Sequence, residues 1–135
     1  MKYLLDTNTC IYLIRQSSPA VRRRLEAHPI EEVAVSAITL GELQHGVARS
    51  RTPDANQAAL DQFLLPLTVL PFDYRAAAIF GPVRVALERQ GQTIGPYDLL
   101  IAACALSAGL TVVTNNIREF ARVPGLLVED WTAQG

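Results

Sequence analysis

The sequence predicts an α/β protein, a three-layer α/β/α sandwich with a central, mostly parallel sheet. Short apolar runs alternate along the chain with longer helical patterns, the order that a parallel sheet covered by helices on both faces produces. The runs are apolar at nearly every position, as in strands that are buried on both faces. The predicted strands are residues 2–5, 33–36, 67–72, 110–114 and 126–128.

Capping residues and prolines mark where the predicted helices begin. Thr7 and Asn8 are both N-cap types at the start of the first helix, and Ser18 followed by Pro19 opens the second. Residues 49–54 form the clearest linker, since they contain Ser, Thr, Pro and Asp between two helical patterns. The predicted helices are residues 9–14, 19–27, 37–49, 53–65, 74–89 and 99–106, and Pro96 sets the first turn of the last one, which contains Asp98.

Length and composition point to one domain that spans residues 1–135. Half of the 135 residues are hydrophobic, and Trp131 is expected to cover the core near the end of the chain. A net charge of −1 excludes a strong basic field, so a nucleic acid would have to be bound by a local patch. Cys10 and Cys104 lie singly in apolar helical stretches, which favours reduced core residues over metal ligands.

The chain offers no secretory signal, because Asp6 interrupts the apolar run at its start. Its longest uninterrupted apolar run, residues 99–106, is far too short to cross a bilayer. We therefore expect a cytoplasmic protein with no membrane segment.

Four acidic residues are expected to meet at one edge of the sheet. Asp6 follows the first strand, and Glu42 lies in the helix that leaves the second. Asp98 opens the helix that precedes the fourth strand, and Glu119 follows that strand by five residues. Helices run antiparallel to the strands of such a sheet, so all four positions belong to its carboxyl edge, where open α/β sheets bind their ligands.

Each acid also has a purely structural interpretation. Asp6 is well placed to cap the next helix, Glu42 to face solvent, and Asp98 to stabilise a helix dipole by about 0.3–1 kcal/mol. Gly41 and Gly46 flank the region of Glu42 and predict close backbone packing there, which favours a functional role for this glutamate. The convergence of four acids supports a site more strongly than any one of them does.

Clustered carboxylates repel one another and raise each other's pKa, so a fold keeps such a cluster when a cation holds it. Ligands that are all oxygen suit Mg²⁺ or Mn²⁺ better than zinc. Such a site polarises a phosphoryl oxygen and lowers the pKa of a bound water that attacks phosphorus. The residues therefore indicate phosphodiester hydrolysis.

Four segments of the chain resemble the PIN-domain ribonucleases and, within them, the VapC toxins of bacterial toxin–antitoxin pairs. The match runs from Asp6 to Trp131, and four weak motifs in this order and spacing make a specific signal. The resemblance implies a Mg²⁺-dependent endoribonuclease, with Mn²⁺ as a substitute, and inhibition by a cognate antitoxin. The segments are Leu5-Asp6-Thr7-Asn8, Leu40-Gly41-Glu42-Leu43, Ile94-Gly95-Pro96-Tyr97-Asp98 and Val113-Thr114-Asn115-Asn116-Ile117-Arg118-Glu119-Phe120.

The resemblance also assigns roles and partners. The expected catalytic residues are Asp6, Glu42, Asp98 and Glu119; those expected to bind metal are Asp6, Asp98 and Glu119, supported by Thr7, Asn8, Thr114 and Asn116. Many relatives carry Asp directly after the fourth strand, where this chain has Asn115 and Asn116, so we propose Glu119 as the fourth acid. Thr114 is expected to orient one carboxylate. The expected partners are an antitoxin, an RNA substrate, most often tRNA in this family, and a second copy in a homodimer.

Other classes fit less well. A haloacid-dehalogenase-like phosphatase needs a second Asp at the position of Asn8, and a receiver domain needs an acidic pair near the first strand, which this chain lacks before Asp6. A catalytically inactive PIN-like module that binds RNA or protein is the remaining alternative. Metal-dependent cleavage of RNA, with EDTA as the control, separates it from a live nuclease.

Overall fold

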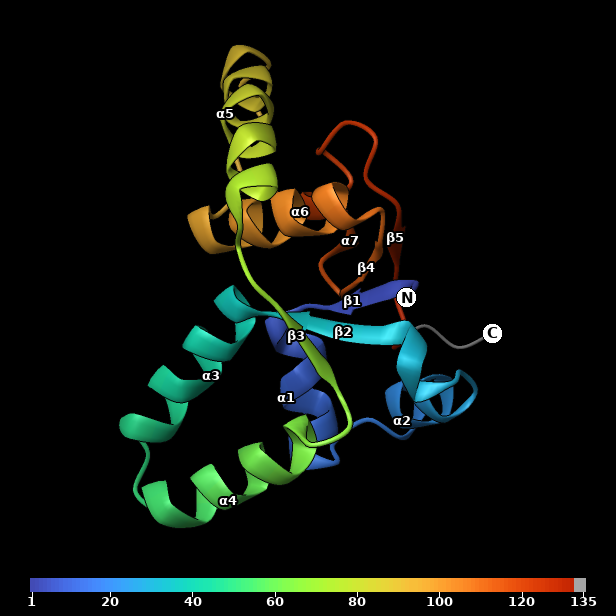
Figure 1. Ribbon diagram of the computed structural model, residues 1–135, viewed down its shortest axis with the longest axis vertical. Coiled ribbons are helices and arrows are strands. Elements are labelled where there is room, and N and C mark those ends of the chain that lie inside the picture. Colours follow the sequence, from blue (N-terminus) through green and yellow to red (C-terminus); the bar gives the residue numbers. More distant parts are fainter. Residues whose placement is uncertain (133–135) are drawn as a thin grey trace.

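The computed structural model describes residues 1–132 and contains five parallel strands in the order β3-β2-β1-β4-β5 (Figure 1). β1 pairs with β2 on one side and with β4 on the other, so the first strand lies at the centre of the sheet. The predicted parallel sheet is confirmed. The strands are β1 (Tyr3–Leu5), β2 (Val33–Ser36), β3 (Thr68–Leu70), β4 (Thr111–Val113) and β5 (Val128–Glu129).

Helices cover both faces of this sheet. Side chains alternate along a strand, so Leu4 packs against the helices of one face and Leu5 against those of the other. The first face carries α5, α6 and α7, and the second carries α1 to α4. The helices are α1 (Thr7–Arg15), α2 (Pro19–Glu26), α3 (Ala37–Ala48), α4 (Pro53–Leu64), α5 (Tyr74–Arg89), α6 (Pro96–Ala108) and α7 (Ile117–Phe120), with a 3₁₀ turn η1 at Ile30–Glu32.

α6 is the most deeply buried of these helices, as its uniformly apolar sequence predicts. It begins at Pro96, three residues before the apolar run, because proline is well accommodated in a first helical turn. Gly109 ends it in the left-handed region, with φ of 68°. α5 packs against α6, crosses it at a steep angle and projects away from the sheet (Figure 1).

The end of the chain differs from the sequence prediction. The last strand is Val128–Glu129 instead of residues 126–128, because pairing with β4 sets its register at Val112 with Val128 and at Val113 with Glu129. Trp131 is buried as expected and packs edge-on against Tyr3, with ring centroids 5.2 Å apart. In the described part of the chain, no helix has the length and apolar composition to cross a membrane.

The topology puts several helix starts at the carboxyl edge of the sheet. α1 follows β1 directly and α3 follows β2 directly, while α6 runs back toward β4 and therefore also begins at this edge. The Ser36 side chain caps α3 by accepting a hydrogen bond of 3.0 Å from the Thr39 amide. The carboxyl edge, where the sequence predicts the site, is thus formed by the ends of the central strands and by helix N-termini.

Candidate active site

Asp6 occupies the corner between β1 and α1 and is almost fully buried. Its Oδ1 accepts a hydrogen bond of 2.8 Å from the Thr9 amide, so Asp6 itself caps α1. The prediction of Thr7 and Asn8 as the caps was wrong, because the helix already begins at Thr7. Burial raises the pKa of Asp6, while contacts with Thr114 and Thr9 lower it and the charge of Glu42 raises it slightly further. One carboxylate thus caps a helix and also faces the other acids.

Thr9 is a site residue that the sequence argument missed. It is buried, and its hydroxyl donates a hydrogen bond of 3.0 Å to the Val113 carbonyl on β4. The start of α1 is therefore tied to the neighbouring strand, which fixes the Asp6 carboxylate relative to the end of β4. A threonine three residues after a capping aspartate is the signal that could have identified it.

Asp98 and Glu119 form the second half of the cluster. Glu119 Oε1 accepts a hydrogen bond of 2.6 Å from the Gly95 amide, directly before α6. A Cβ placed on Gly95 would lie 3.6 Å from Glu119 Oε1 and 3.8 Å from Asp98 Oδ2, so both carboxyl groups face the same turn. Asp98 and Glu119 therefore lie together, as the topology of the sheet predicts.

The pKa of Asp98 is raised by burial and by the other three acids. Burial, the charge of Glu119 and hydrogen bonding to its carboxyl group together raise this pKa from 3.8 to about 7, and burial contributes most. The charges of Asp6 and Glu42 act in the same direction. The four predicted acids therefore interact electrostatically across one crevice.

Glu42 joins the cluster from α3. Its Oε1 accepts a hydrogen bond of 2.6 Å from the Thr7 hydroxyl, whose oxygen also lies 3.2 Å from that of Thr39. The close backbone packing predicted from Gly41 and Gly46 was wrong, since a Cβ at either position would meet no atom within 4 Å. Open space along the pocket, and not a tight helix contact, surrounds these glycines.

Asn116 and Thr114 support the cluster from the end of β4. The backbone amide of Asn116 donates a hydrogen bond of 2.9 Å to Thr114 Oγ1, and the side-chain amide of Asn116 donates one to Glu119 Oε2. Thr114 is fully buried and contacts the Asp6 carboxylate. Asn116 thus holds Glu119 in place, and Thr114 joins the two halves of the cluster.

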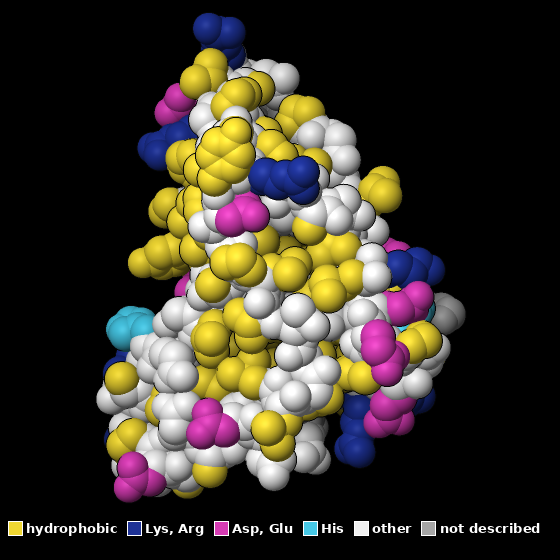
Figure 2. All heavy atoms as spheres, viewed as in Figure 1, with side chains coloured by type: hydrophobic (Ala, Val, Ile, Leu, Met, Phe, Trp, Pro, Cys, Tyr) yellow, Lys and Arg dark blue, Asp and Glu magenta, His cyan; other side chains and the backbone are white. Residues whose placement is uncertain are grey.

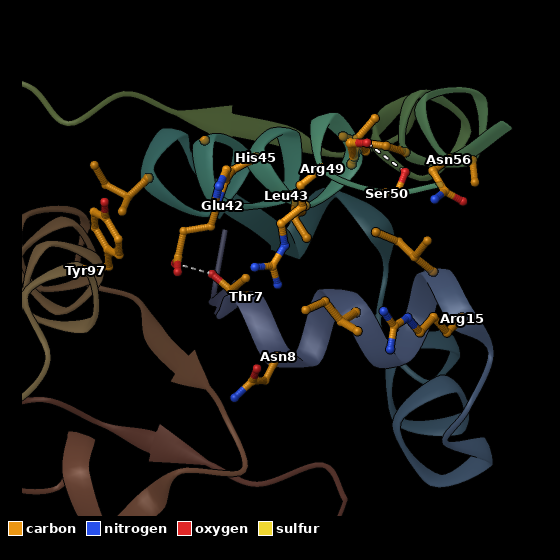
Figure 3. Close-up of a pocket in the computed structure, with 18 of the residues that line it drawn as sticks. Thr7, Asn8, Arg15, Glu42, Leu43, His45, Arg49, Ser50, Asn56 and Tyr97 are labelled. Atoms are coloured by element: carbon orange, nitrogen blue, oxygen red, sulfur yellow. Dashed lines mark hydrogen bonds between the residues drawn. The ribbon is translucent and has the colours of Figure 1, made fainter. Parts of the chain in front are cut away.

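A pocket of about 1050 Å³ lies between α1, α3 and α4, and Glu42 is the one acid of the cluster that lines it (Figure 3). Thr7, Asn8 and Glu42 line it where it meets the acids, and the ring of Tyr97 from α6 lies on that side (Figure 3). Arg15, a residue that sequence reasoning did not select, lies farther along α1. The apolar part of the lining includes Ile11, Ile14, Leu43, Val47 and Leu60.

The donor set suits a hard divalent cation, because every group in the cluster offers oxygen. As the side chains lie, no three His, Cys, Asp or Glu residues within positions 1–132 are grouped so that they could hold one ion. Glu42 instead accepts from Thr7, and Glu119 accepts from Gly95 and Asn116. The chemistry of the cluster thus fits Mg²⁺, while the carboxylates are engaged with local donors.

The parallel sheet, the helices on both faces and the acids at the carboxyl edge define a class of α/β protein with an acidic crevice. Residues 3–126 match the model of the PIN domain, and the chain belongs to this family. It is 44% identical over 131 residues to the tRNA(fMet)-specific endonuclease VapC of Salmonella typhimurium, covering 97% of this chain and 98% of that protein.

Solved structures agree with this assignment. The DNA-bound VapBC of Salmonella typhimurium superposes with a TM-score of 0.92 at 44% identity, covering 97% of this chain and 98% of that one. VapBC2 from Rickettsia felis, bound to a DNA fragment from its promoter, gives a TM-score of 0.90 at 40% identity, with coverage of 97% and 99%. The predicted resemblance to the VapC group is confirmed.

Proposed function

We propose that this protein is a metal-dependent endoribonuclease that cleaves initiator tRNA as the toxin of a toxin–antitoxin pair. The observation that supports this most strongly is the geometry at the carboxyl edge of the sheet, where Glu119 and Asp98 face the same turn and the charges of Asp6 and Glu42 reach Asp98. The substrate is proposed from the Salmonella typhimurium relative, whose name specifies tRNA(fMet). Cleavage of an initiator tRNA would arrest translation and would place the protein in the cytoplasm.

We propose that Asp6, Asp98 and Glu119 hold a Mg²⁺ ion, for which Mn²⁺ can substitute. The ion would polarise the scissile phosphoryl group and lower the pKa of an attacking water. Asp6 supplies a carboxylate whose orientation is fixed by the Thr9 amide and by Thr114. The pKa of Asp98 is raised to about 7 in the metal-free protein, and a bound cation would favour the ionised form that acts as a ligand.

Glu42 is held differently and is proposed to act as the general base that accepts a proton from the attacking water. Its Oε1 is oriented by the Thr7 hydroxyl, which leaves Oε2 available to accept a proton. The match of Glu42 to an acidic position of the family adds to this assignment. Glu119 is oriented by the Gly95 amide and by Asn116, which fixes its carboxylate relative to Asp98.

The proposed protein partner is an antitoxin, because the similar solved structures are of VapBC complexes. The pocket between α1, α3 and α4 combines an apolar lining with an acidic end, which suits an amphipathic segment carrying a basic side chain. Arg15 and Arg49 line the same pocket, and neither is in an ion pair within residues 1–132. They are available to acidic residues of that segment.

The proposed homodimer would use the face around β3 and α5. Leu65, Val69 and Val85 are large apolar side chains that remain exposed there, and hydrophobic atoms gather along α5 and over β3 in Figure 2. β3 is also an edge strand of the sheet. Val85→Glu is expected to reduce the mass in solution to that of a monomer, and a dimer unaffected by this change would contradict the assignment.

The test of the nuclease function is cleavage of tRNA(fMet) by purified protein in Mg²⁺ and in EDTA. Asp6→Asn and Asp98→Asn are expected to abolish cleavage. Asp54→Asn is the matched control, since Asp54 is also an acid in the first turn of a helix that begins with proline. Wild-type rates in either site variant would contradict the proposal, and RNA binding without any cleavage by the wild type would favour an inactive module.

A further inference from the structure

Tyr97 is an exposed aromatic side chain directly beside the acidic cluster. Its side chain is 59% exposed although its sequence neighbour Asp98 is part of the site. Within residues 1–132 its ring stacks on no other aromatic ring. Tyr97 lines the pocket at the end where Glu42 and Thr7 lie, and Figure 3 shows its ring on the α6 side of that opening.

The backbone that carries this ring is held in a defined place. Pro96 sets φ in the first turn of α6, and the Leu99 amide donates a hydrogen bond of 2.9 Å to the Gly95 carbonyl. The Gly95 amide is in turn anchored by 2.6 Å to Glu119 Oε1. The position of Tyr97 relative to the acids is therefore fixed by the same turn that positions two of them.

An RNA strand at this crevice meets four carboxyl groups, which repel its phosphates. Binding there is helped by a contact that carries no charge. Every nucleobase has a π-face, and stacking on a protein aromatic ring strengthens binding by about 5- to 150-fold per base. An exposed ring beside the cleavage site provides such a contact.

We infer that Tyr97 stacks on a nucleobase next to the scissile phosphate and so positions the RNA against the four acids. The inference rests on the proposed nuclease function and adds a positioning residue to it. The alternative is that the Tyr97 ring contacts a protein partner instead of RNA. The RNA is favoured because Tyr97 directly precedes Asp98, a residue of the proposed cleavage site, while the apolar lining proposed for the antitoxin comes from α1, α3 and α4.

The first test compares kcat/KM for cleavage of tRNA(fMet) in Mg²⁺. Tyr97→Ala is expected to lose about 5- to 150-fold, mainly through a higher KM, and Tyr97→Phe to stay within about twofold because phenylalanine also stacks. Tyr74→Ala is the matched control, since it removes a tyrosine that is 86% exposed at the start of the neighbouring helix. Melting temperature and mass in solution are measured for each variant, to separate stacking from folding and assembly.

The second test removes the base instead of the ring. In a short RNA that contains the mapped cleavage site, an abasic nucleotide replaces each flanking base in turn. For one of these substrates, the kcat/KM of the wild type is expected to fall by the same factor as the Tyr97→Ala change causes on the intact RNA. When the variant is given that substrate, kcat/KM is expected to fall little further. Equal abasic losses in wild type and variant would overturn the inference.

The outcomes separate this inference from the proposed function. A wild type that cleaves no RNA contradicts both. A wild type that cleaves while Tyr97→Ala keeps its full kcat/KM contradicts the stacking role alone. If that variant cleaves normally but binds a purified antitoxin more weakly, the ring serves the protein partner and the inference is wrong.

Discussion

Asp98→Asn is expected to stabilise the metal-free protein at pH 8 and to have little effect near pH 4. The pKa of Asp98 rises from 3.8 to about 7 on folding, so the native state binds more protons than the unfolded state between these values. Stability therefore falls as pH rises through this window, and the whole penalty is present above pH 7. Asparagine carries no titrating proton and is free of this penalty.

The size of the effect follows from the shift. The rise of the Asp98 pKa from 3.8 to about 7 corresponds to a loss of at most about 4 kcal/mol in the free energy of unfolding. Solvent screens the partly exposed carboxyl group, and the lost interaction with the α6 dipole offsets about 0.3–1 kcal/mol. We therefore expect a net gain of about 1–2 kcal/mol at pH 8, which raises the melting temperature by about 3–8 °C.

The assay is thermal unfolding in EDTA at pH 4 and pH 8 for wild type, Asp98→Asn and Asp54→Asn. Asp54 lies on the exposed side of α4, so its substitution is expected to show no pH-dependent gain. A difference between wild type and Asp98→Asn that does not change with pH, or a variant that melts lower at pH 8, would refute the electrostatic reasoning.

Three further predictions concern the ligand set, the core and the biology. Glu119→Gln is expected to raise the Mg²⁺ concentration for half-maximal cleavage more than Asn116→Ala does, since a carboxylate binds a hard dication better than an amide; the reverse order would reassign the ligand. Trp131→Ala is expected to cost about 3–5 kcal/mol in chemical denaturation, because its buried ring packs on Tyr3 and His28, and a loss below 1 kcal/mol would contradict that. Strong expression of the wild type is expected to arrest growth and an antitoxin to relieve the arrest, while unaffected growth with folded, metal-replete protein would count against a toxin.

The parallel sheet and the meeting of the acids were predictable because they depend on topology. Buried strands of a parallel sheet are apolar throughout, and their carboxyl edges coincide whatever the loops do. Asp6, Asp98 and Glu119 could thus be placed together without knowledge of any side-chain conformation. The start of α2 was equally clear, because Ser18 followed by Pro19 is a typical helix beginning, and the Ser18 side chain does accept a hydrogen bond from the third residue of the helix.

Features that depend on packing in three dimensions were not predictable. The two glycines near Glu42 suggested a tight contact, but the structure has open space beside both of them. The register of β5 depends on its pairing with β4 and not on where its own apolar run begins. The position of Tyr97 at the pocket required the fold, since an isolated tyrosine before an aspartate gives no sign of exposure.

Thermal melts of wild type and Asp98→Asn at neutral pH, each in EDTA and in Mg²⁺, test most directly whether the acids form a cation site. At a free concentration a hundred times its dissociation constant, Mg²⁺ is expected to stabilise the wild type by about 2.7 kcal/mol by mass action. The variant has lost a proposed ligand and is expected to gain much less, so the order of the two melting temperatures should reverse on adding Mg²⁺. Equal responses of the two proteins would contradict a cation site built from Asp6, Asp98 and Glu119.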